Sequence, residues 1–379
     1  MMLLGFKTEL KLNNQQRTQL AKHCGVARHA WNWGLALTKN ILDHNKANPE
    51  DKIKFPTAVD LHKWLVAMVK PECPWYYEVS KCAPQYALRQ LAEAWKQGFK
   101  KVKKPPRFKK KGRADSFTVD GSLAVDHFRV KIPVIGWVKT YECLPIDQKP
   151  KSFTISRTAD RWFVSWKIEV NRNWYDSTPT PDEKGLDDWF YPYRCPVLGV
   201  DLGVKTLATL STGEVFEGAK SYRKYERKLS RLQWLNRNKQ RGSNNWKKAK
   251  IQIAQLHSKI ANIRKDTLHK LTSYLAKNHS KIGIEDLSVS GMLANHKLAK
   301  AIADMGFYEF RRQLEYKCEL YGSELVVVNR WFASSKTCSN CGTKKETLSL
   351  MTRVFECGHC GFTCDRDLNA SINLEKAVS

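Results

Sequence analysis

Hydrophobic residues recur at helical spacing in the first third of the chain. After a short strand-like opening, residues 1–12, the polar residues 13–16 have the pattern of a helix start, a side-chain acceptor followed three residues later by a glutamine. Apolar residues then recur at steps of three and four over 20–35 and again over 88–102. This spacing predicts a helical domain over residues 13–115.

The hydrophobic period changes from helical spacing to two in the next segment. Hydrophobic residues occupy every second position over 162–170, and residues 158–161 have the composition of a turn from a preceding strand. We therefore predict a small antiparallel sheet or barrel over residues 116–180. Residues 181–196 are rich in proline and aspartate and show no sustained period, which predicts a linker and a domain boundary.

The second half of the chain alternates apolar strands with helical segments, which is typical of an α/β domain. The order is strand, hairpin, helices, strand, helix, strand, helix, which is the order of a ribonuclease-H-like fold. We predict this α/β domain over residues 197–337 and, after a cysteine-rich insertion at 338–360, over the final segment 361–379. The predicted elements are a strand run at 197–210, a glycine turn at 211–213, a second strand at 214–217, two basic helices within 220–277, a strand at 280–287, a helix at 299–321, a strand at 324–329 and a last helix from Asp367.

Two cysteine pairs occupy the predicted insertion, Cys338 with Cys341 and Cys357 with Cys360. In each pair a glycine follows the second cysteine and lets backbone amides turn toward the sulfurs, so that four thiolates can close a tetrahedral shell. We predict one structural zinc ion held by these four cysteines. Two reducible disulfides are the alternative, which the absence of a secretory signal disfavours, and Cys364 lies close enough to be a substitute ligand.

The charge of the chain points to a polyanionic partner. Its 65 lysines and arginines against 37 acids give a formal net charge of +28, and nucleic acid is the expected partner. The first helical domain ends in a proline-containing basic run around one aromatic ring, which suits a nucleic-acid backbone with stacked bases but equally suits a flexible basic linker. The candidate nucleic-acid-binding residues of this run are Lys103, Lys104, Arg107, Phe108, Lys109, Lys110 and Lys111.

The hydrophobic runs of the chain are short. None approaches the roughly 18 residues needed to span a bilayer, and the opening residues lack the basic segment of a signal peptide. We therefore expect a cytoplasmic protein without a membrane partner.

Three acids stand at the ends of elements that the predicted fold brings together: Asp201, Glu285 and Asp367. Phosphodiester hydrolysis by two divalent ions needs converging carboxylates, because oxygen ligands bind hard cations such as Mg²⁺. Each acid also has an alternative interpretation. The turn at Asp201 resembles the phosphate-contacting turn of actin-like ATPases, Glu285 with Asp286 is compatible with a helix cap or an ion pair, and Asp365 or Asp367 is compatible with a cap of the last helix.

The motifs around these acids and cysteines resemble those of the TnpB family, insertion-sequence-encoded RNA-guided DNA nucleases related to the compact type V CRISPR effectors. The resemblance covers nearly the whole length, and its most specific parts are the cysteine pairs and the final block. The matching segments are 86–99, 104–111, 199–204, 283–287, 310–317, 334–338 and 365–373.

This resemblance implies a RuvC nuclease core with an inserted zinc ribbon. In that core, Asp201, Glu285 and Asp367 would bind the catalytic magnesium, and two ions are expected. Asp365 is the less favoured candidate for the third acid. It also implies that residues 1–12 and 116–180 form a wedge-like β-barrel into which the helical recognition domain is inserted. The implied partners are a guide RNA transcribed from the end of the element, one protein per RNA, and double-stranded target DNA carrying a short flanking motif. Base pairing would read the target sequence, and the protein would read the heteroduplex backbone and the flanking motif.

Two other functions remain compatible with the residues. One is an RNA-guided DNA-binding protein without cleavage, and the other is a DNA transposase that joins strands with the same carboxylates. The three intact acids favour the nuclease over the first, and the domains that precede the nuclease core favour it over the second.

Overall fold

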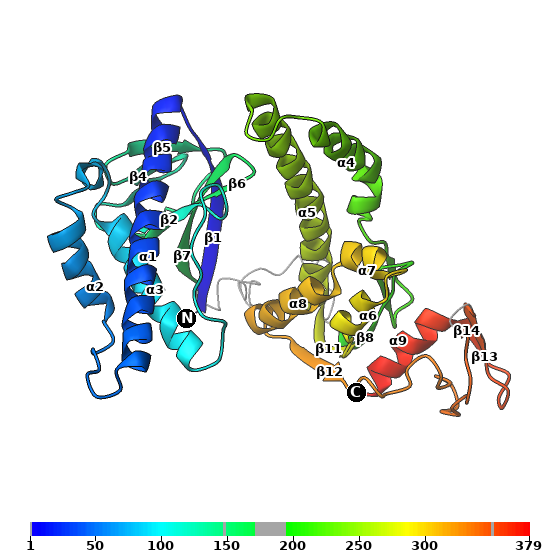
Figure 1. Cartoon of the computed structure of the whole chain (residues 1–379). Helices are drawn as coiled ribbons and strands as arrows, with labels where there is room; N and C mark the ends of the chain where they lie inside the picture. Colours follow the sequence, from blue (N-terminus) through cyan, green and yellow to red (C-terminus); the bar gives the residue numbers. More distant parts are fainter. Residues whose placement is uncertain (1, 147–148, 171–194, 350–351) are drawn as a thin grey trace, which may run out of the picture. The chain divides into compact units, whose positions relative to one another are not determined.

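The computed structural model describes residues 2–146, 149–170, 195–349 and 352–379, which fall into two compact units divided after Val170 (Figure 1). Most of the predicted linker, residues 181–194, lies outside the described residues. The prediction that the linker extends to residue 196 is wrong, because Cys195 and Pro196 already belong to strand β8. In the described part of the chain, no helix combines the length and the apolar character that crossing a membrane requires.

A seven-stranded antiparallel sheet forms one layer of the first unit, in the order β2-β6-β7-β1-β5-β4-β3. Strand β1 (Met2–Lys11) pairs with β7 (Arg161–Val170) and with β5 (Gly136–Thr140). The first strand therefore belongs to the same sheet as the strands that follow the helical segment. The other strands are β2 (Ser116–Val119), β3 (Ala124–Asp126), β4 (Arg129–Ile132) and β6 (Phe153–Thr158).

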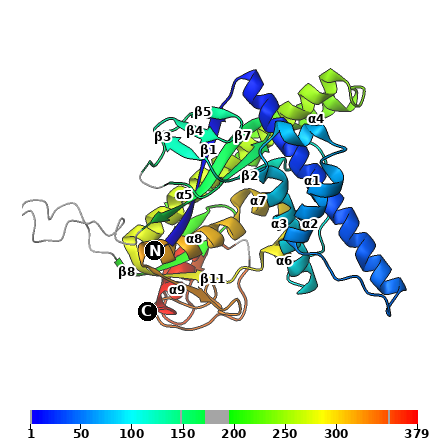
Figure 2. The same ribbon diagram turned by 90° about the vertical axis from the view of Figure 1, so that its left-hand side faces the viewer.

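Helices inserted between β1 and β2 cover this sheet (Figure 2). The capping box predicted at residues 13–16 is confirmed: the Asn13 side chain accepts from the backbone N–H of Gln16, and Gln16 returns the bond. In the middle of α1, Gly34 allows close packing on α3, where a Cβ would lie 2.8 Å from Leu88. The helical segments are α1 (Asn14–Ala47), α2 (Ala58–Trp64), the π-helical turn η1 (Leu65–Val69), the 3₁₀ turn η2 (Pro74–Glu78) and α3 (Cys82–Phe99).

The second unit contains a five-stranded mixed sheet in the order β10-β9-β8-β11-β12. Strand β11 (His279–Glu285) lies parallel between β8 (Cys195–Leu202) and β12 (Glu324–Val328), whereas β9 (Ala208–Leu210) runs antiparallel to β8 and β10 (Val215–Phe216) runs antiparallel to β9. The run 197–210, predicted as one strand, is thus two strands. Periodicity missed the intervening turn because both limbs are apolar.

Helices pack on both faces of this mixed sheet. Helices α5 and α8 bury their apolar residues against β8 and β11, and α4 and α5 form a long hairpin (Figure 1). The single helix predicted over 299–321 is broken at Gly306, whose φ of 77° ends α7 before α8 begins. The helices are α4 (Ser221–Arg237), α5 (Asn244–Asn278), α6 (Val289–Ala294), α7 (Ala299–Met305), α8 (Phe307–Tyr321) and α9 (Arg366–Lys376).

Candidate active site and metal centre

Two neighbouring parallel strands carry the same short pattern, a glycine followed two residues later by an acid. Gly199 and Asp201 lie near the end of β8, and Gly283 and Glu285 lie at the end of β11. The two strands pair with Gly283 opposite Gly199. Because side chains alternate between the faces of a strand, each acid projects from the same face as its glycine. The two carboxylates therefore share one face and one edge of the sheet.

Helix α9 packs directly on these glycines. A Cβ atom built on Gly199 would lie 1.9 Å from the carbonyl oxygen of Ser371, and one built on Gly283 would lie 3.0 Å from a carbonyl oxygen of the same helix. Asp367 stands one turn before Ser371, in the first turn of α9. The four residues from Ser371 back to Asp367 span about 6 Å along the helix, and the two residues from Gly199 to Asp201 span about 6.6 Å along the strand. The packing of α9 therefore brings Asp367 to the level of Asp201.

The three carboxylates repel one another electrostatically. Burial, followed by the charges of Asp367 and Glu285, raises the pKa of Asp201 to about 7, and the charge of Arg366 opposes this shift. Burial also raises the pKa of Glu285. A divalent cation bound by carboxylate oxygens would relieve both the repulsion and the desolvation. The donor set therefore fits a hard cation such as Mg²⁺.

The two acids at the start of α9 have different contacts. Asp365 is the N-cap residue, and its Oδ1 accepts hydrogen bonds from the backbone N–H groups of Asp367 at 2.9 Å and Leu368 at 3.1 Å. Asp367 is partly buried, and of the neighbouring charges it raises the pKa of Asp201 most. The helix-cap interpretation thus applies to Asp365, and Asp367 is the better candidate for the third acid.

Glu285 and its neighbour Asp286 also differ in their contacts. Asp286 forms ion pairs with Arg311, at 2.7 Å, and with Arg330. Hydrogen bonds from Arg330 and then Arg311 hold the pKa of Asp286 below its usual range, whereas burial raises that of Glu285. A carboxylate already neutralised by two guanidinium groups is a poor metal ligand. Of the two acids, Glu285 is therefore the one available to a cation.

A groove of about 630 Å³ opens beside Glu285. Arginines and an exposed tyrosine give its walls the chemistry of a phosphate and base contact surface. The residues that line it are Leu202, Ile284, Glu285, Leu287, Ser288, Val289, Ser290, Phe307, Tyr308, Arg311, Arg312, Glu315 and Arg330.

The four predicted cysteine ligands come together. The Sγ atoms of Cys338 and Cys360 lie 3.7 Å apart, and those of Cys341 and Cys357 lie 3.6 Å apart. A tetrahedral zinc site with bonds of about 2.3 Å has sulfurs about 3.8 Å apart, whereas a disulfide bond is about 2.05 Å long. The cluster therefore fits a metal ion rather than two disulfides, and Cys364 is not one of its members.

The cysteine cluster is the tightest candidate metal site in the described residues. It is the one group of three or more Cys, His, Asp or Glu residues there whose ligand atoms all lie within 4.8 Å of one another. The three acids are thus spread more widely than the sulfurs. Two-metal sites hold their ions about 3.5–4 Å apart, which requires carboxylates spread around both ions rather than gathered on one.

Glycine turns shape both halves of the cysteine cluster, as the sequence predicts. Gly342 and Gly361 follow the second cysteine of each pair and have φ values of 77° and 71°, a conformation that favours glycine. Their N–H groups donate to the carbonyl oxygens of Cys338 and Cys357, at 2.9 and 3.1 Å. Strands β13 (Val354–Glu356) and β14 (Thr363–Asp365) form a small sheet that leads from this cluster into α9.

The side chains of two asparagines on α9 hydrogen-bond to the segment that leads into the cysteine cluster. Asn369 donates to the carbonyl oxygen of Thr337 at 2.7 Å and accepts from the N–H of Ser339 at 2.9 Å. Asn373, one turn later, donates to the carbonyl oxygens of Ser334 and Thr337. Both asparagines are buried. The helix that carries Asp367 is therefore positioned by the sheet on one side and by the cysteine segment on another.

The basic run of the first unit is fixed to α1, which contradicts the flexible-linker interpretation. Trp31 donates its ring N–H to the carbonyl oxygen of Arg107, and Asn32 exchanges two hydrogen bonds with the backbone of Lys109. The Lys109 ammonium lies 4.0 Å from the centroid of the Trp31 ring, and burial lowers its pKa. Lys109 is thus the least accessible of the candidate residues. The exposed candidates are Lys103, Lys104, Arg107, Phe108, Lys110 and Lys111.

Several residues that build the site are not evident candidates in the sequence. Gly199 and Gly283 allow α9 to pack closely on the sheet. In the sequence, both could be recognised as a glycine two residues before an acid in a predicted strand. Asn369 and Asn373 connect α9 to the cysteine segment. Their spacing of four residues in the sequence places both side chains on one face of the last helix. Arg330 has no comparable signal, because only the fold brings it beside Asp286.

Replacing Gly199 with alanine is expected to disable the acidic site without changing any acid. The new methyl group would overlap the backbone of α9 at Ser371, so the helix must shift and carry Asp367 with it. A displacement of about 1 Å costs on the order of 100-fold in rate. Cleavage assays and thermal unfolding would measure the effect. Gly5→Ala is the control, because a Cβ there meets nothing within 4 Å, and equal activity of both variants would contradict the packing argument.

Stability of the metal-free protein should depend on pH through Asp201. Its pKa is raised from 3.8 to about 7, so the folded state keeps a proton that the unfolded chain has released between about pH 4 and 7. Stability is therefore lost as the pH rises through this window, by on the order of 4 kcal/mol. Asp201→Asn removes the charge, so its melting temperature should exceed the wild-type value increasingly from pH 4 to 7 without Mg²⁺. A constant difference across that range would argue against burial of this charge.

Three family profiles match consecutive parts of the chain. They are described as "Helix-turn-helix domain" over residues 1–47, "Probable transposase" over 195–296 and "Cas12f1-like, TNB domain" over 307–374. In this structure, residues 14–47 form one continuous helix. The last profile spans the cysteine cluster and most of α9.

Individual relatives match either nearly the whole chain or a part of it. It is 33% identical to the "Putative RNA-guided DNA endonuclease InsQ" of Escherichia coli (strain K12), over 98% of this chain and 91% of that protein. It is 33% identical to the "TnpB-like protein L79" of Acanthamoeba polyphaga mimivirus over 34% of this chain and 26% of that protein. A solved Cas12f1–sgRNA–target DNA complex aligns over 99% of both chains, with 15% identity and a TM-score of 0.37. The near full-length match to the first relative shows that this chain belongs to the TnpB family of insertion-sequence proteins.

Proposed function

We propose that this protein is an RNA-guided DNA endonuclease that cleaves guide-complementary DNA beside a short flanking motif by divalent-metal-dependent hydrolysis. The observation that supports this most is the convergence of Asp201, Glu285 and Asp367 at one edge of the mixed sheet, with the pKa of Asp201 raised by burial and by the other two charges. The expected partners are a guide RNA transcribed from the end of the element, bound by one protein, and double-stranded target DNA.

The second unit would then be a RuvC-like nuclease core with an inserted zinc ribbon. In its sheet, β10, β9 and β8 form an antiparallel meander, and β11 and β12 continue the sheet parallel to β8. This order agrees with a ribonuclease-H-like fold. In the first unit, β1 and the strands after residue 115 would form the wedge, and α1 to α3 the recognition domain. The cysteine cluster would hold one zinc ion, which would fix the local fold rather than take part in the reaction.

In the proposed mechanism, Asp201, Glu285 and Asp367 would hold two Mg²⁺ ions. Bound there, the ions would supply activation of the attacking water and stabilisation of the leaving oxygen. The groove beside Glu285 would receive the DNA strand, with Arg311 and Arg330 facing its phosphates. Asp286 holds both guanidinium groups in place and would thereby orient them for the strand.

The proposal is tested by co-expressing the protein with the DNA that flanks its gene and sequencing the RNA that copurifies. The purified complex is then incubated with Mg²⁺ and a plasmid library that carries a guide-matched target beside randomised bases. Depletion of plasmids that share one short motif is the expected result. A specific RNA without cleavage would instead support guided binding, and the absence of any specific RNA would support a transposase or a plain DNA-binding protein.

Neutralising the exposed lysines of the basic run is expected to weaken RNA binding and flatten its salt dependence. Each lost phosphate contact lowers the slope of log K against log salt by roughly 0.7–0.9. We therefore expect the quadruple Lys→Gln variant at Lys103, Lys104, Lys110 and Lys111 to reduce the slope by up to about 3. Lys109→Gln is the matched control, because its ammonium is packed on Trp31. An equal change of slope in the control would contradict the role assigned to the exposed lysines.

A further inference from the structure

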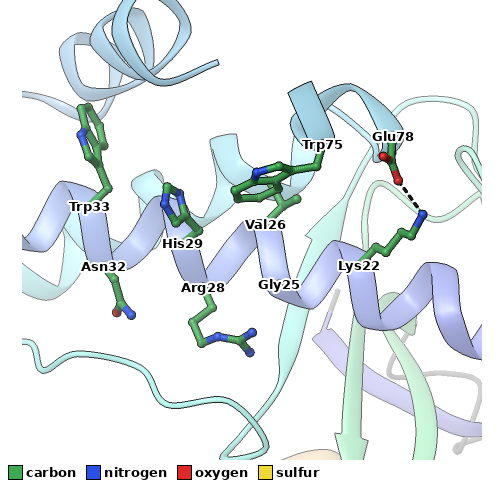
Figure 3. A pocket seen from close by; sticks show the side chains of 9 residues that line it. All are labelled: Lys22, Gly25, Val26, Arg28, His29, Asn32, Trp33, Trp75 and Glu78. Carbon is green, nitrogen blue, oxygen red and sulfur yellow. Dashed lines mark hydrogen bonds and ion pairs between the residues drawn. The ribbon is translucent and has the colours of Figure 1, made fainter. Parts of the chain in front are cut away.

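A pocket on the first unit combines aromatic rings with basic side chains, outside every element of the acidic and cysteine sites. It has a volume of about 890 Å³, within the usual range for small-ligand sites. It is formed along one stretch of α1 and by η2 (Figure 3). The residues that line it are Lys22, Gly25, Val26, Arg28, His29, Asn32, Trp33, Trp75 and Glu78.

The aromatic wall of the pocket is fixed in orientation and remains open to solvent. Trp75 is 38% exposed although tryptophan carries a large apolar surface. Its position is set by contacts with His29, at 5.1 Å between ring centroids and nearly perpendicular, and with Tyr76 at 4.6 Å. The His29 ring in turn hydrogen-bonds the Tyr76 hydroxyl at 2.8 Å. Trp75 therefore offers a rigid, preorganised face for stacking.

The floor of the pocket contains a glycine that packing does not require. A Cβ added at Gly25 would approach only the end of the Arg28 side chain, at 3.9 Å. Gly34 in the same helix is different, because a Cβ there would collide with Leu88 and Leu91 of α3. A glycine inside a helix lowers its stability relative to alanine. Because Gly25 lines the pocket, its missing side chain leaves part of the pocket unfilled.

Two basic residues line the pocket, Lys22 and Arg28, each in an ion pair with an acid, and Asn32 connects its wall to the fixed basic run. In Figure 3, Trp33, His29 and Trp75 lie on one side of α1, and Arg28 and Asn32 point to the other side. Asn32 holds the backbone of Lys109, and Arg28 pairs with Asp115, which also accepts from the N–H of Gly112. The exposed lysines of the basic run are thus held next to one side of the pocket. At its end, Glu78 is neutralised by an ion pair with Lys22.

We propose that this pocket binds one unstacked nucleobase of a single-stranded RNA segment, with the base on Trp75 and the adjacent phosphates on the basic run. The inference rests on the proposed function for the presence of RNA. Aromatic rings beside lysines and arginines are the usual means of binding single-stranded nucleic acid. We assign the bound base to RNA and not to DNA, because RNA loops and bulges already present unpaired bases, whereas a DNA duplex must first flip a base out.

The test measures the affinity of the full-length protein, freed of copurified RNA, for fluorescein-labelled r(A)10 and d(A)10 by anisotropy over a range of salt. Trp75→Ala removes the stacking face, and Gly25→Leu fills the pocket in a place where the helix has room. Both should weaken r(A)10 binding about tenfold with an unchanged salt slope, because neither removes a phosphate contact. Tyr77→Ala is the matched control, since Tyr77 is 70% exposed and lies two residues after Trp75 but does not line the pocket.

Wild-type affinity in Gly25→Leu would overturn the proposal even if Trp75→Ala weakened binding, because Trp75 would then act outside the pocket. An equal or larger loss for d(A)10 would overturn the assignment to RNA. Thermal unfolding of Gly25→Leu should match or exceed the wild type, which separates pocket filling from misfolding. A wild-type protein that binds neither decamer would overturn the inference together with the proposed function, whereas normal wild-type binding with unaffected variants would overturn the inference alone.

Discussion

Replacing Asp201 with alanine is expected to lower cleavage of guide-matched DNA by roughly 10³-fold while leaving RNA and target binding nearly intact. Asp201 interacts electrostatically with both of the other acids, because the charges of Asp367 and Glu285 each raise its pKa. Replacing it removes one of the three candidate metal ligands. Binding should survive, since the change removes a negative charge and no cationic group.

The measurement uses the purified protein–RNA complex, with cleavage followed on a linear target and binding followed by gel shift without Mg²⁺. Glu285→Ala is expected to behave in the same way. Asp266→Ala is the control, because Asp266 is an exposed acid on α5 that forms an ion pair with Lys270 within the same helix. Loss of RNA binding in Asp201→Ala would show instead that this acid is required for the fold.

The sequence predicted the order of elements well because hydrophobic periodicity reflects burial. The long helices and the strands at β1, β7, β11 and β12 all agree with their predicted segments. The errors fall where a break leaves the periodicity unchanged. The turn at Gly203 joins two apolar strands, and the positive φ of Gly306 ends one amphipathic helix just before another begins. The first break is an irregular connection over residues 203–207 and the second is the conformation of one glycine, and hydrophobic composition reports neither.

The candidate site was predictable as far as residue type and local spacing define it. The cysteine cluster could be predicted because each pair is a local turn, and only the meeting of the two pairs depends on the fold. Choosing Asp367 over Asp365, or Glu285 over Asp286, could not be decided in this way. Those choices depend on which carboxylate meets a backbone N–H or a guanidinium group, and such contacts come from distant segments.

The pocket on α1 shows a further limit of sequence reasoning. Trp75 and Gly25 are 50 positions apart in the chain, and neither belongs to a periodic pattern. An exposed tryptophan in a short 3₁₀ turn and a glycine in a helix each have ordinary explanations when considered alone. Both line the same pocket, and only the fold brings them together there.

Loss of the cysteine cluster is expected to affect both the fold and the reaction. Replacing Cys338 and Cys341 with serine should reduce bound zinc from one ion per chain to none by elemental analysis. Structural zinc contributes about 10–16 kcal/mol in small zinc domains, comparable to the entire stability of a typical domain. The hydrophobic core around the cluster is small, with Phe355 as its one fully buried large side chain among the described residues. We therefore expect it to unfold and become sensitive to protease.

Cleavage should fall with it, because the disordered segment would release α9. Asn369 and Asn373 hold that helix through the carbonyl oxygens of Thr337 and Ser334, immediately before Cys338. Asp367 would then lose one of the two supports that position it, although none of the three acids has changed. Cys364→Ser is the matched control, since this cysteine packs beside the cluster without belonging to it. Unchanged zinc content in the double variant would exclude these sulfurs as ligands, and full cleavage after zinc loss would show that the sheet alone positions α9.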